Sequence, residues 1–128
     1  LRRWQDTAAL LAPEAPITIS RALREMSFGV WEGKTALQCL RSHRRRFEAW
    51  MQNPASVTPP RGESLAALSR RVRSYVTRMV RRHPRETLAF VTHGGAIRTL
   101  LAQAPSDFWS ASVPTGALIE HEWKGSRR

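Results

Sequence analysis

Apolar residues recur at helical spacing in several stretches of the chain, and each such stretch predicts an amphipathic helix. The clearest one follows Ser64, a candidate N-cap, and ends before Pro84. Its apolar positions are Leu65, Leu68, Val72, Tyr75, Val76, Met79 and Val80. Residues 2–12 and 35–51 show the same period. We expect each of these helices to bury one side.

Shorter apolar runs between the helices predict strands. Residues 16–20 form a β-branched run, residues 87–91 are a continuous apolar run, and residues 116–123 alternate apolar and polar side chains as an edge strand would. A helix follows the second of these runs and extends to about Gln103. Helices that alternate with short strands indicate an α/β fold. At 128 residues the chain is expected to form a single domain.

The net charge of +11 suggests nucleic acid as a possible partner class. The arginines nevertheless fall mostly on the polar faces of the predicted helices, without interleaved aromatic residues or a recognisable reader motif. The helix after Ser64 carries six of them, Arg70, Arg71, Arg73, Arg78, Arg81 and Arg82. We therefore interpret the charge as a solvated basic surface rather than a nucleic-acid site.

Other features of the composition narrow the class of protein. No apolar run approaches the ~20 residues of a membrane span, so no membrane partner is expected. The single cysteine, Cys39, cannot form an internal disulfide and fits a reducing cytoplasm. The histidines show no metal-ligand spacing and have no cysteine cluster beside them, so no metal is predicted.

The stretch His93-Gly94-Gly95 lies between the apolar run 87–91 and the helical pattern that starts at Ile97. This order predicts a buried strand, a tight glycine turn and a helix. Open α/β sheets bind ligands at the carboxyl ends of their strands, and the amino terminus of a helix favours an anion. His93 is thus a candidate site residue, with a structural histidine at a turn as the alternative.

Residues 23–35 show neither helical nor strand period and contain glycines, aromatic residues and two carboxylates. We interpret them as a structured loop after a strand, a place that often carries function. Glu25 in this loop is a candidate general acid. The alternative is that Glu25 is a solvated loop carboxylate, while Phe28 and Trp31 only pack.

Several segments together resemble one family, the histidine phosphatases of the phosphoglycerate mutase-like superfamily. The matching pieces are Leu1-x-Arg3-x-x-x-Thr7-Ala8, Leu23-x-Glu25-x-x-Phe28-Gly29-x-Trp31-Glu32-Gly33 and Thr92-His93-Gly94-Gly95, supported by Gly62-Glu63-Ser64 and Val113-Pro114-Thr115-Gly116. The aromatic loop looks most like the small bacterial phosphatase branch, which includes α-ribazole phosphatases. The resemblance implies a three-layer α/β/α sandwich.

The resemblance also implies a reaction and roles for particular residues. A histidine attacks a phosphomonoester, and water then hydrolyses the phosphohistidine, with no metal or other cofactor. By position, Arg3 resembles a phosphate-binding arginine, Glu25 the proton donor and His93 a second phosphate-binding histidine. The amides of Gly94 and Gly95 would line the pocket. The implied substrate is a small phosphorylated molecule: α-ribazole phosphate, a sugar phosphate or a broad range of such esters.

The sequence departs from the family at the nucleophile, because no Arg-His-Gly motif occurs in it. His43 and His83 both lie on predicted helices. We expect an amino-terminally truncated domain that lacks its first strand and helix, roughly 30 residues or more. Such a chain should be inactive by itself. Phosphoglycerate mutase-type phosphotransfer, a non-catalytic basic module that binds phosphate groups or nucleic acid, and a fragment stable only with a partner chain are the alternatives.

Overall fold

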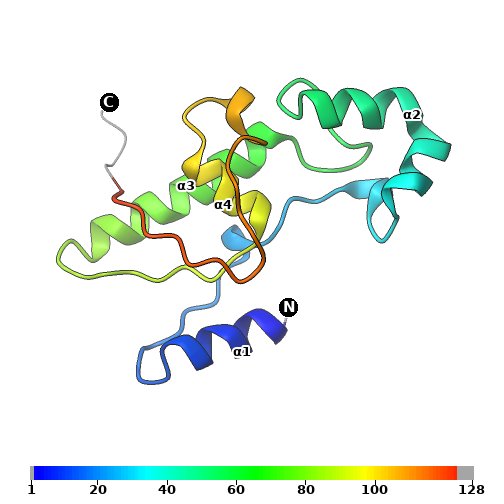
Figure 1. The fold of residues 1–128 in the computed structure, drawn as a ribbon. Helices are drawn as coiled ribbons and strands as arrows, with labels where there is room; N and C mark the ends of the chain where they lie inside the picture. The colour runs from blue at the N-terminus through cyan, green and yellow to red at the C-terminus, as the bar shows by residue number, and fades with distance from the viewer. Residues whose placement is uncertain (1, 124–128) are drawn as a thin grey trace.

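The computed structural model describes residues 2–123, apart from the side chain of Arg3 (Figure 1). Its helices are α1 (Arg2–Leu11), α2 (Ala36–Gln52), α3 (Leu65–Arg82) and α4 (Gly94–Leu101), and short 3-10 turns form η1 (Arg21–Leu23), η2 (Gly29–Trp31) and η3 (Pro105–Asp107). The helices predicted from apolar spacing are therefore confirmed, with bounds that differ from the prediction by a residue or two.

The long helix α3 begins and ends where the sequence predicts. The hydroxyl of Ser64 accepts a hydrogen bond from the Ala67 backbone N–H at 3.1 Å, which caps the helix. Five of the predicted apolar positions are buried, and Leu68 and Val72 are fully inaccessible to solvent. Arg81 and Arg82 lie in the last turn, where the helix dipole favours positive charge.

Helix α2 bends at His43, whose backbone is not helical (φ −144°, ψ 38°), and Figure 1 shows the change of direction. Just before the bend, the Ser42 hydroxyl donates to the carbonyl of Gln38 at 2.9 Å. Bonds of this kind to the preceding turn often bend helices. The apolar spacing along residues 35–51 does not indicate the bend.

The core lies where α3, α4, the carboxyl half of α2 and the loop before α2 meet. Its buried members are Met26, Trp31, Cys39, Trp50, Leu65, Leu68, Val72, Val76, Ala96 and Phe108. Within it, Trp31 and Trp50 pack edge to face with ring centroids 5.8 Å apart, a favourable arrangement for aromatic pairs. None of the described helices is long and apolar enough to cross a membrane.

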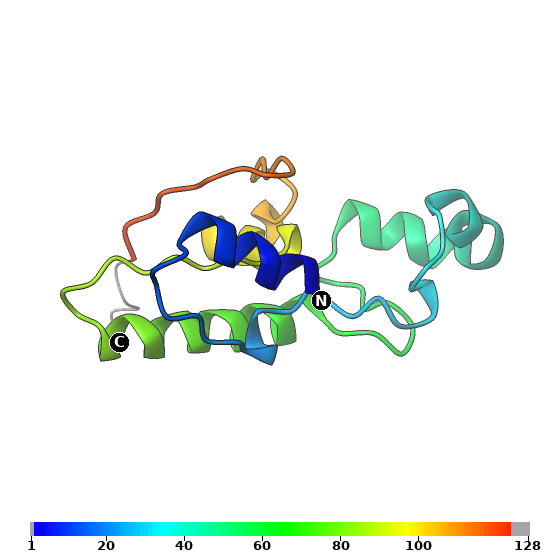
Figure 2. The ribbon, with the colours of Figure 1, turned by 90° about the horizontal axis from the view of Figure 1, so that it is seen from below.

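No strand is assigned among residues 2–123, so the sheet of the predicted sandwich is not confirmed. The segments 16–20, 87–91 and 116–123 have no strand assignment, no backbone hydrogen bonds join one to another, and Figures 1 and 2 draw them without arrows. The prediction of a buried strand at 87–91 also differs from the structure, in which these residues are half-buried or exposed. A strand assignment requires backbone hydrogen bonds to a neighbouring strand, and none is found between these described segments.

Candidate active site at the amino terminus of α4

His93 is the N-cap residue of α4, with extended backbone (φ −101°, ψ 160°). Its carbonyl accepts the first helical hydrogen bond, from the Ile97 N–H at 3.0 Å. Its imidazole makes no capping bond and packs against the ring of Trp4 in α1, with centroids 4.6 Å apart. The histidine that the sequence singled out therefore lies between the first and the last α-helices.

Glu25 reaches the same helix terminus from a distant part of the chain. The Gly95 N–H donates to Glu25 Oε2 at 3.1 Å across 70 residues of sequence, and the Met26 N–H donates to Oε1 at 2.8 Å. A Cβ at position 95 would overlap the Glu25 carboxylate. Glycine is required at this position because only hydrogen lets the carboxylate approach the backbone so closely.

A second contact fixes the turn before α4 against the Glu25 loop. The hydroxyl of Thr92, a buried residue, donates to the carbonyl of Leu23. Thr92 precedes His93, and Leu23 lies two residues before Glu25, so this bond spans both halves of the site. The structure thus brings together Glu25, His93, Gly94 and Gly95, whereas the side chain of Arg3 lies outside the described part of the chain.

Arg71 of α3 holds the backbone up to and including Glu25. Its guanidinium donates to the carbonyls of Ala22 and Arg24, each at 2.8 Å, and to that of Glu25 at 3.0 Å. It also forms a bidentate pair with the carboxylate of Glu63, with both N···O distances at 2.7 Å. All five N–H groups of this arginine therefore have an acceptor.

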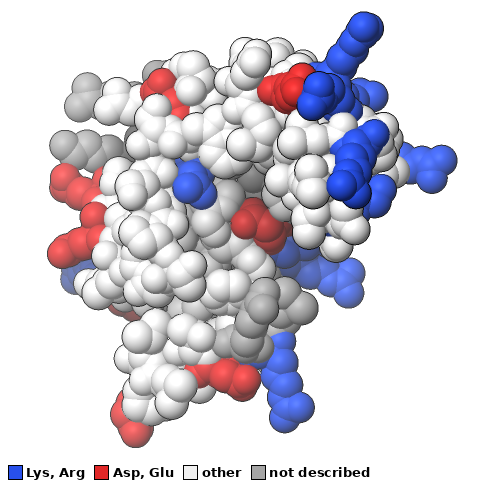
Figure 3. All heavy atoms as spheres, turned by 45° about the vertical axis from the view of Figure 1, so that its right-hand side comes forward, with Lys and Arg blue, Asp and Glu red and all other residues white. Residues whose placement is uncertain are grey.

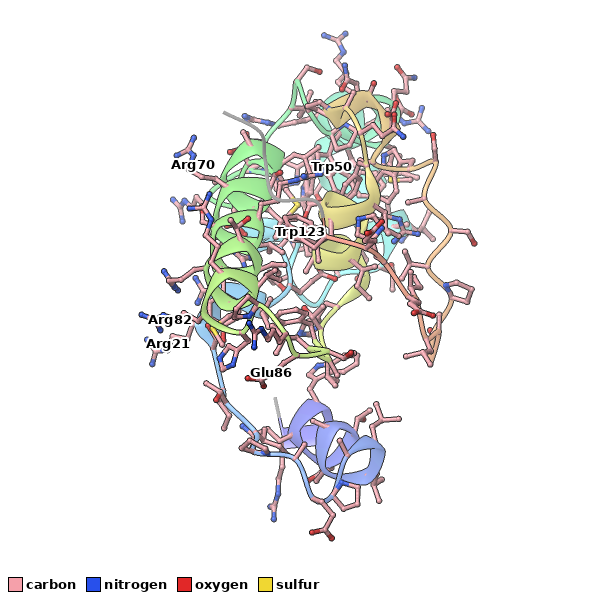
Figure 4. The ribbon with its side chains drawn as sticks, turned by 90° about the vertical axis from the view of Figure 1, so that its left-hand side faces the viewer. Arg21, Trp50, Arg70, Arg82, Glu86 and Trp123 are labelled. Carbon is pink, nitrogen blue, oxygen red and sulfur yellow. The ribbon has the colours of Figure 1, made fainter. Side chains whose placement is uncertain are left out.

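This arrangement corrects one interpretation of the sequence. The arginines of α3 were predicted to form a solvated helix surface, and Figure 4 shows Arg70 and Arg82 pointing away from the core. Arg71 instead points inward and is largely buried together with Glu63. The available signal was the Gly62-Glu63-Ser64 match, which places a carboxylate just before the N-cap of α3 and eight residues ahead of Arg71.

The ionisation of Glu63 follows from this contact. Burial by itself raises the pKa of the Glu63 carboxyl, but the hydrogen bonds and charge of Arg71, with the Ser27 N–H and the charge of Arg24, outweigh burial and leave the pKa lowered. The Glu63 N–H in turn donates to the Ser27 carbonyl at 2.8 Å. The loop that carries Glu25 is therefore pinned by a charged pair.

The rest of the aromatic loop has structural roles. Gly29 has a positive φ of 55°, and a Cβ there would overlap the Pro60 carbonyl, which accepts a hydrogen bond from Val30 N–H at 3.0 Å. The Glu32 carboxylate accepts from the Phe28 N–H at 2.7 Å. The Phe-Gly-x-Trp-Glu-Gly pattern is thus explained by local geometry, which leaves Glu25 as the carboxylate of this loop that faces α4.

A cavity of about 100 Å³ opens beside Glu25. Its lining comes from four parts of the chain: Glu25, Met26, Phe28, Trp50, Gly95, Arg98, Phe108 and Trp109. A larger cavity of about 440 Å³ lies between α3, the end of α4 and η3, and none of the predicted site residues lines it. The smaller cavity is therefore the candidate site, because it is lined by both the Glu25 carboxyl group and the amino terminus of α4.

The histidines that the sequence placed on helices do not join this site. His43 is at the bend of α2, 6.5 Å from the ring of Trp31, and His83 caps the end of α3 with Nδ1 3.0 Å from Glu86 Oε1. Neither lines the cavity beside Glu25. Within residues 2–123, no group of three or more His, Cys, Asp or Glu side chains has a geometry that could hold a metal ion.

The sequence matches the histidine phosphatase superfamily (branch 1) over residues 1–128. The chain belongs to this superfamily. It is 29% identical over 105 residues to the adenosylcobalamin/alpha-ribazole phosphatase of Escherichia coli, covering 80% of this chain and 52% of that protein. It is 28% identical over 116 residues to phosphoserine phosphatase 1 of Hydrogenobacter thermophilus, covering 86% and 55%.

A solved structure agrees with these matches. YhfR of Bacillus stearothermophilus superposes with a TM-score of 0.77 at 32% identity, over 86% of this chain and 57% of that one. The predicted resemblance is therefore confirmed at the level of the superfamily. The histidine phosphatase chain spans about half the length of the curated relatives that it matches.

The Arg71–Glu63 pair generates a prediction about stability. Replacing Glu63→Gln should lower the free energy of unfolding at pH 7 by about 1.5–3 kcal/mol, because a charged hydrogen-bond partner of Arg71 is lost. In the parent chain this contribution is complete above the ordinary pKa of 4.5 and is lost as the pH falls through the lowered folded-state pKa. Denaturant titrations between pH 7 and pH 3 should therefore show the parent and variant converging in acid.

Glu48→Gln is the matched control, because Glu48 pairs with Arg44 at 3.6 Å on the exposed surface of α2. Such pairs contribute between zero and about 1 kcal/mol. A Glu63→Gln variant as stable as this control at pH 7 would show that the buried pair does not hold the loop.

Proposed function

We propose that this chain forms the larger part of a phosphomonoester hydrolase that works through a phosphohistidine, and that it is inactive without the segment that supplies the nucleophile. The observation that carries the proposal is the 3.1 Å hydrogen bond between Glu25 Oε2 and the N–H of Gly95, two residues after His93. The bond joins a carboxyl group to the helix amino terminus that follows the imidazole-bearing residue His93. A phosphoryl group that leaves an alcohol needs these three kinds of group.

In the proposed first step, the nucleophilic histidine forms an N–P bond while the P–O bond to the alcohol breaks. Glu25 donates its proton to the departing oxygen, which leaves as a neutral alcohol. In the second step, water attacks the phosphohistidine and Glu25 takes the proton of the water. Orthophosphate is released and the histidine is restored. Each step leaves the protein in the ionisation state that the next one requires.

His93 and the amino terminus of α4 stabilise the charge on the transferring group. Peptide N–H groups in the first turn and the helix dipole favour an anion at this position. Arg3 is assigned a second phosphate contact by its position in the family motif. Stabilisation by preorganised donors is the main contribution expected in phosphoryl transfer, because the transferring group itself carries most of the charge.

We further propose that the complete fold is a three-layer α/β/α sandwich and that this chain lacks its first strand and helix. Three apolar side chains on the segments predicted as strands support this: Ile17 is 48% exposed, Ile19 71% and Leu118 94%. Such exposure is expected of a sheet whose central neighbour is missing, because both the apolar side chains and the backbone groups of its strands then lack partners. We also propose a cytoplasmic location, in keeping with the unpaired Cys39.

The names of the relatives support a small phosphorylated substrate. Two curated relatives are named for phosphoserine or for alpha-ribazole and adenosylcobalamin chemistry, and both are phosphatases. These names favour hydrolysis over mutase-type phosphotransfer.

Glu25→Gln should separate substrates by leaving group in a protein that contains this chain together with a nucleophilic histidine. We expect kcat for an alkyl phosphate to fall about 10²–10⁴-fold and kcat for 4-nitrophenyl phosphate to fall much less, because nitrophenolate leaves without a proton. Steady-state assays of both esters provide the measurement. Glu32→Gln, in the same loop, is the control, and any loss there should be equal for the two esters. An equal loss for Glu25→Gln would remove Glu25 as the proton donor.

His93→Ala in the same protein should reduce kcat/KM on the order of 10²-fold for both esters, the usual effect of removing one donor to a developing anion. His121→Ala is the control, because His121 is exposed and does not line the cavity beside Glu25. Thermal melts of both variants test the contact with Trp4 separately. Unchanged activity in a well-folded His93→Ala variant would contradict the proposed role.

One observation favours a second candidate function, a basic module that binds nucleic acid or other phosphate-rich partners. The exposed arginines of α2 gather at one end of the molecule, as Figure 3 shows, and they are Arg41, Arg44, Arg45 and Arg46. If this function holds, duplex DNA or RNA should bind, and the affinity should fall steeply between 50 and 200 mM salt. Fluorescence anisotropy provides the measurement. Lack of binding at 50 mM salt would eliminate this function.

A further inference from the structure

The small cavity beside Glu25 contains two buried N–H donors without an acceptor among the described residues. They are Nε1 of Trp50 and Nε of Arg98, and both residues line this cavity. Trp50 is only 5% exposed, and Figure 4 shows it inside the molecule. A buried donor without a partner costs about 1–3 kcal/mol, and most such groups are paired in proteins. Two of them around one cavity point to a ligand that carries a hydrogen-bond acceptor.

The walls of the cavity are aromatic and suit a flat ligand. The ring of Trp50 meets those of Phe28 and Trp109 edge to face, with centroid distances of 5.7 and 5.4 Å. Trp109 is 39% exposed and therefore forms the wall nearest to solvent. An apolar cavity of about 150 Å³ holds a benzene ring, so this smaller cavity of about 100 Å³ admits at most a single ring, part of which stays in its open mouth.

The charges around the cavity favour a neutral ligand. Glu25 contributes a carboxyl group and Arg98 a guanidinium, whose carbon lies 5.6 Å from the centroid of the Trp109 ring. Burying an ionic ligand in so small a space costs far more than burying a neutral one that makes the same hydrogen bonds. A carbonyl or amide oxygen accepts from N–H groups without bringing a charge of its own.

The position of the cavity links it to the proposed reaction. Glu25 and Gly95 line it, and in the proposed reaction the departing oxygen must lie within hydrogen-bond reach of the Glu25 carboxyl. We infer that the cavity holds the alcohol part of the substrate, and that this part is a neutral aromatic ring with a carbonyl or amide acceptor that meets Trp50 and Arg98. This inference rests on the proposed function, and the experiment below separates the two.

Isothermal titration calorimetry on the 128-residue chain at pH 7 tests the pocket by binding, without any need for turnover. The ligands are 4-hydroxybenzamide, 4-ethylphenol, which has a similar shape but no acceptor on the ring substituent, and 4-hydroxybenzoate, which adds a negative charge. We expect 4-hydroxybenzamide to bind about tenfold more tightly than 4-ethylphenol, the effect of one or two buried hydrogen bonds. We expect 4-hydroxybenzoate to bind more weakly than the amide.

The variant Trp50→Phe keeps an aromatic wall and removes one N–H donor. It should lose most of the preference for 4-hydroxybenzamide and leave 4-ethylphenol nearly unchanged. Arg98→Met removes the second donor and serves as the independent variant if Trp50→Phe fails to fold in circular dichroism melts. Trp123→Phe is the matched control, because the Trp123 Nε1 is also buried without an acceptor among residues 2–123 but the residue does not line this cavity.

Equal affinity for the amide and 4-ethylphenol, or a preference that survives in the folded Trp50→Phe or Arg98→Met variant, overturns the inference. Tungstate, a phosphate mimic, tests the phosphoryl site in a separate titration. Binding of tungstate but not of 4-hydroxybenzamide overturns the pocket assignment alone. Selective binding of 4-hydroxybenzamide without tungstate supports the pocket and counts against the phosphoryl site. If neither binds, both are overturned.

Discussion

The position of Glu25 depends on the guanidinium of Arg71. The stretch between η1 and η2 that carries Glu25 cannot hold a carboxyl group in place through its own backbone, because it has no helical or sheet hydrogen bonds of its own. Arg71 supplies what the loop lacks by donating to three of its carbonyls. The Glu63 carboxylate offsets the cost of burying the Arg71 guanidinium, because a buried guanidinium without a carboxylate partner would be strongly destabilising. The charged pair is therefore a scaffold for the loop rather than part of its chemistry.

The candidate site is built from close approaches between backbone and side chains. Gly95 admits the Glu25 carboxylate, Thr92 ties the turn before α4 to the loop, and Trp4 packs on His93. Each contact joins elements that are far apart in the sequence. These contacts also depend on the residue type at one position: the Thr92 hydroxyl, the Trp4 ring, or a glycine without a side chain at position 95. This explains how short motifs separated by tens of residues can specify one small space.

The helices and the extended segments differ in what they need from the rest of the chain. Helices α1, α2 and α3 satisfy their own backbone groups and form as soon as one apolar side is covered. The segments 16–20, 87–91 and 116–123 need neighbours for both their hydrogen bonds and their side chains. The described structure contains the helices and the candidate site. In the fold that we propose, a further strand would supply the missing hydrogen-bond partners of the sheet.

The sequence by itself determined the helices, the buried side of α3 and the superfamily, because helical periodicity is local and the motifs keep their order along the chain. It also identified Glu25, His93, Gly94 and Gly95 as candidates, although their roles stay predictions. Only the tertiary structure showed that Arg71 points inward, that α2 bends at His43, and that Trp50 and Arg98 share a cavity with Glu25. These features arise from contacts between residues that are distant in the sequence. No local pattern encodes which arginine of a helix finds a buried carboxylate.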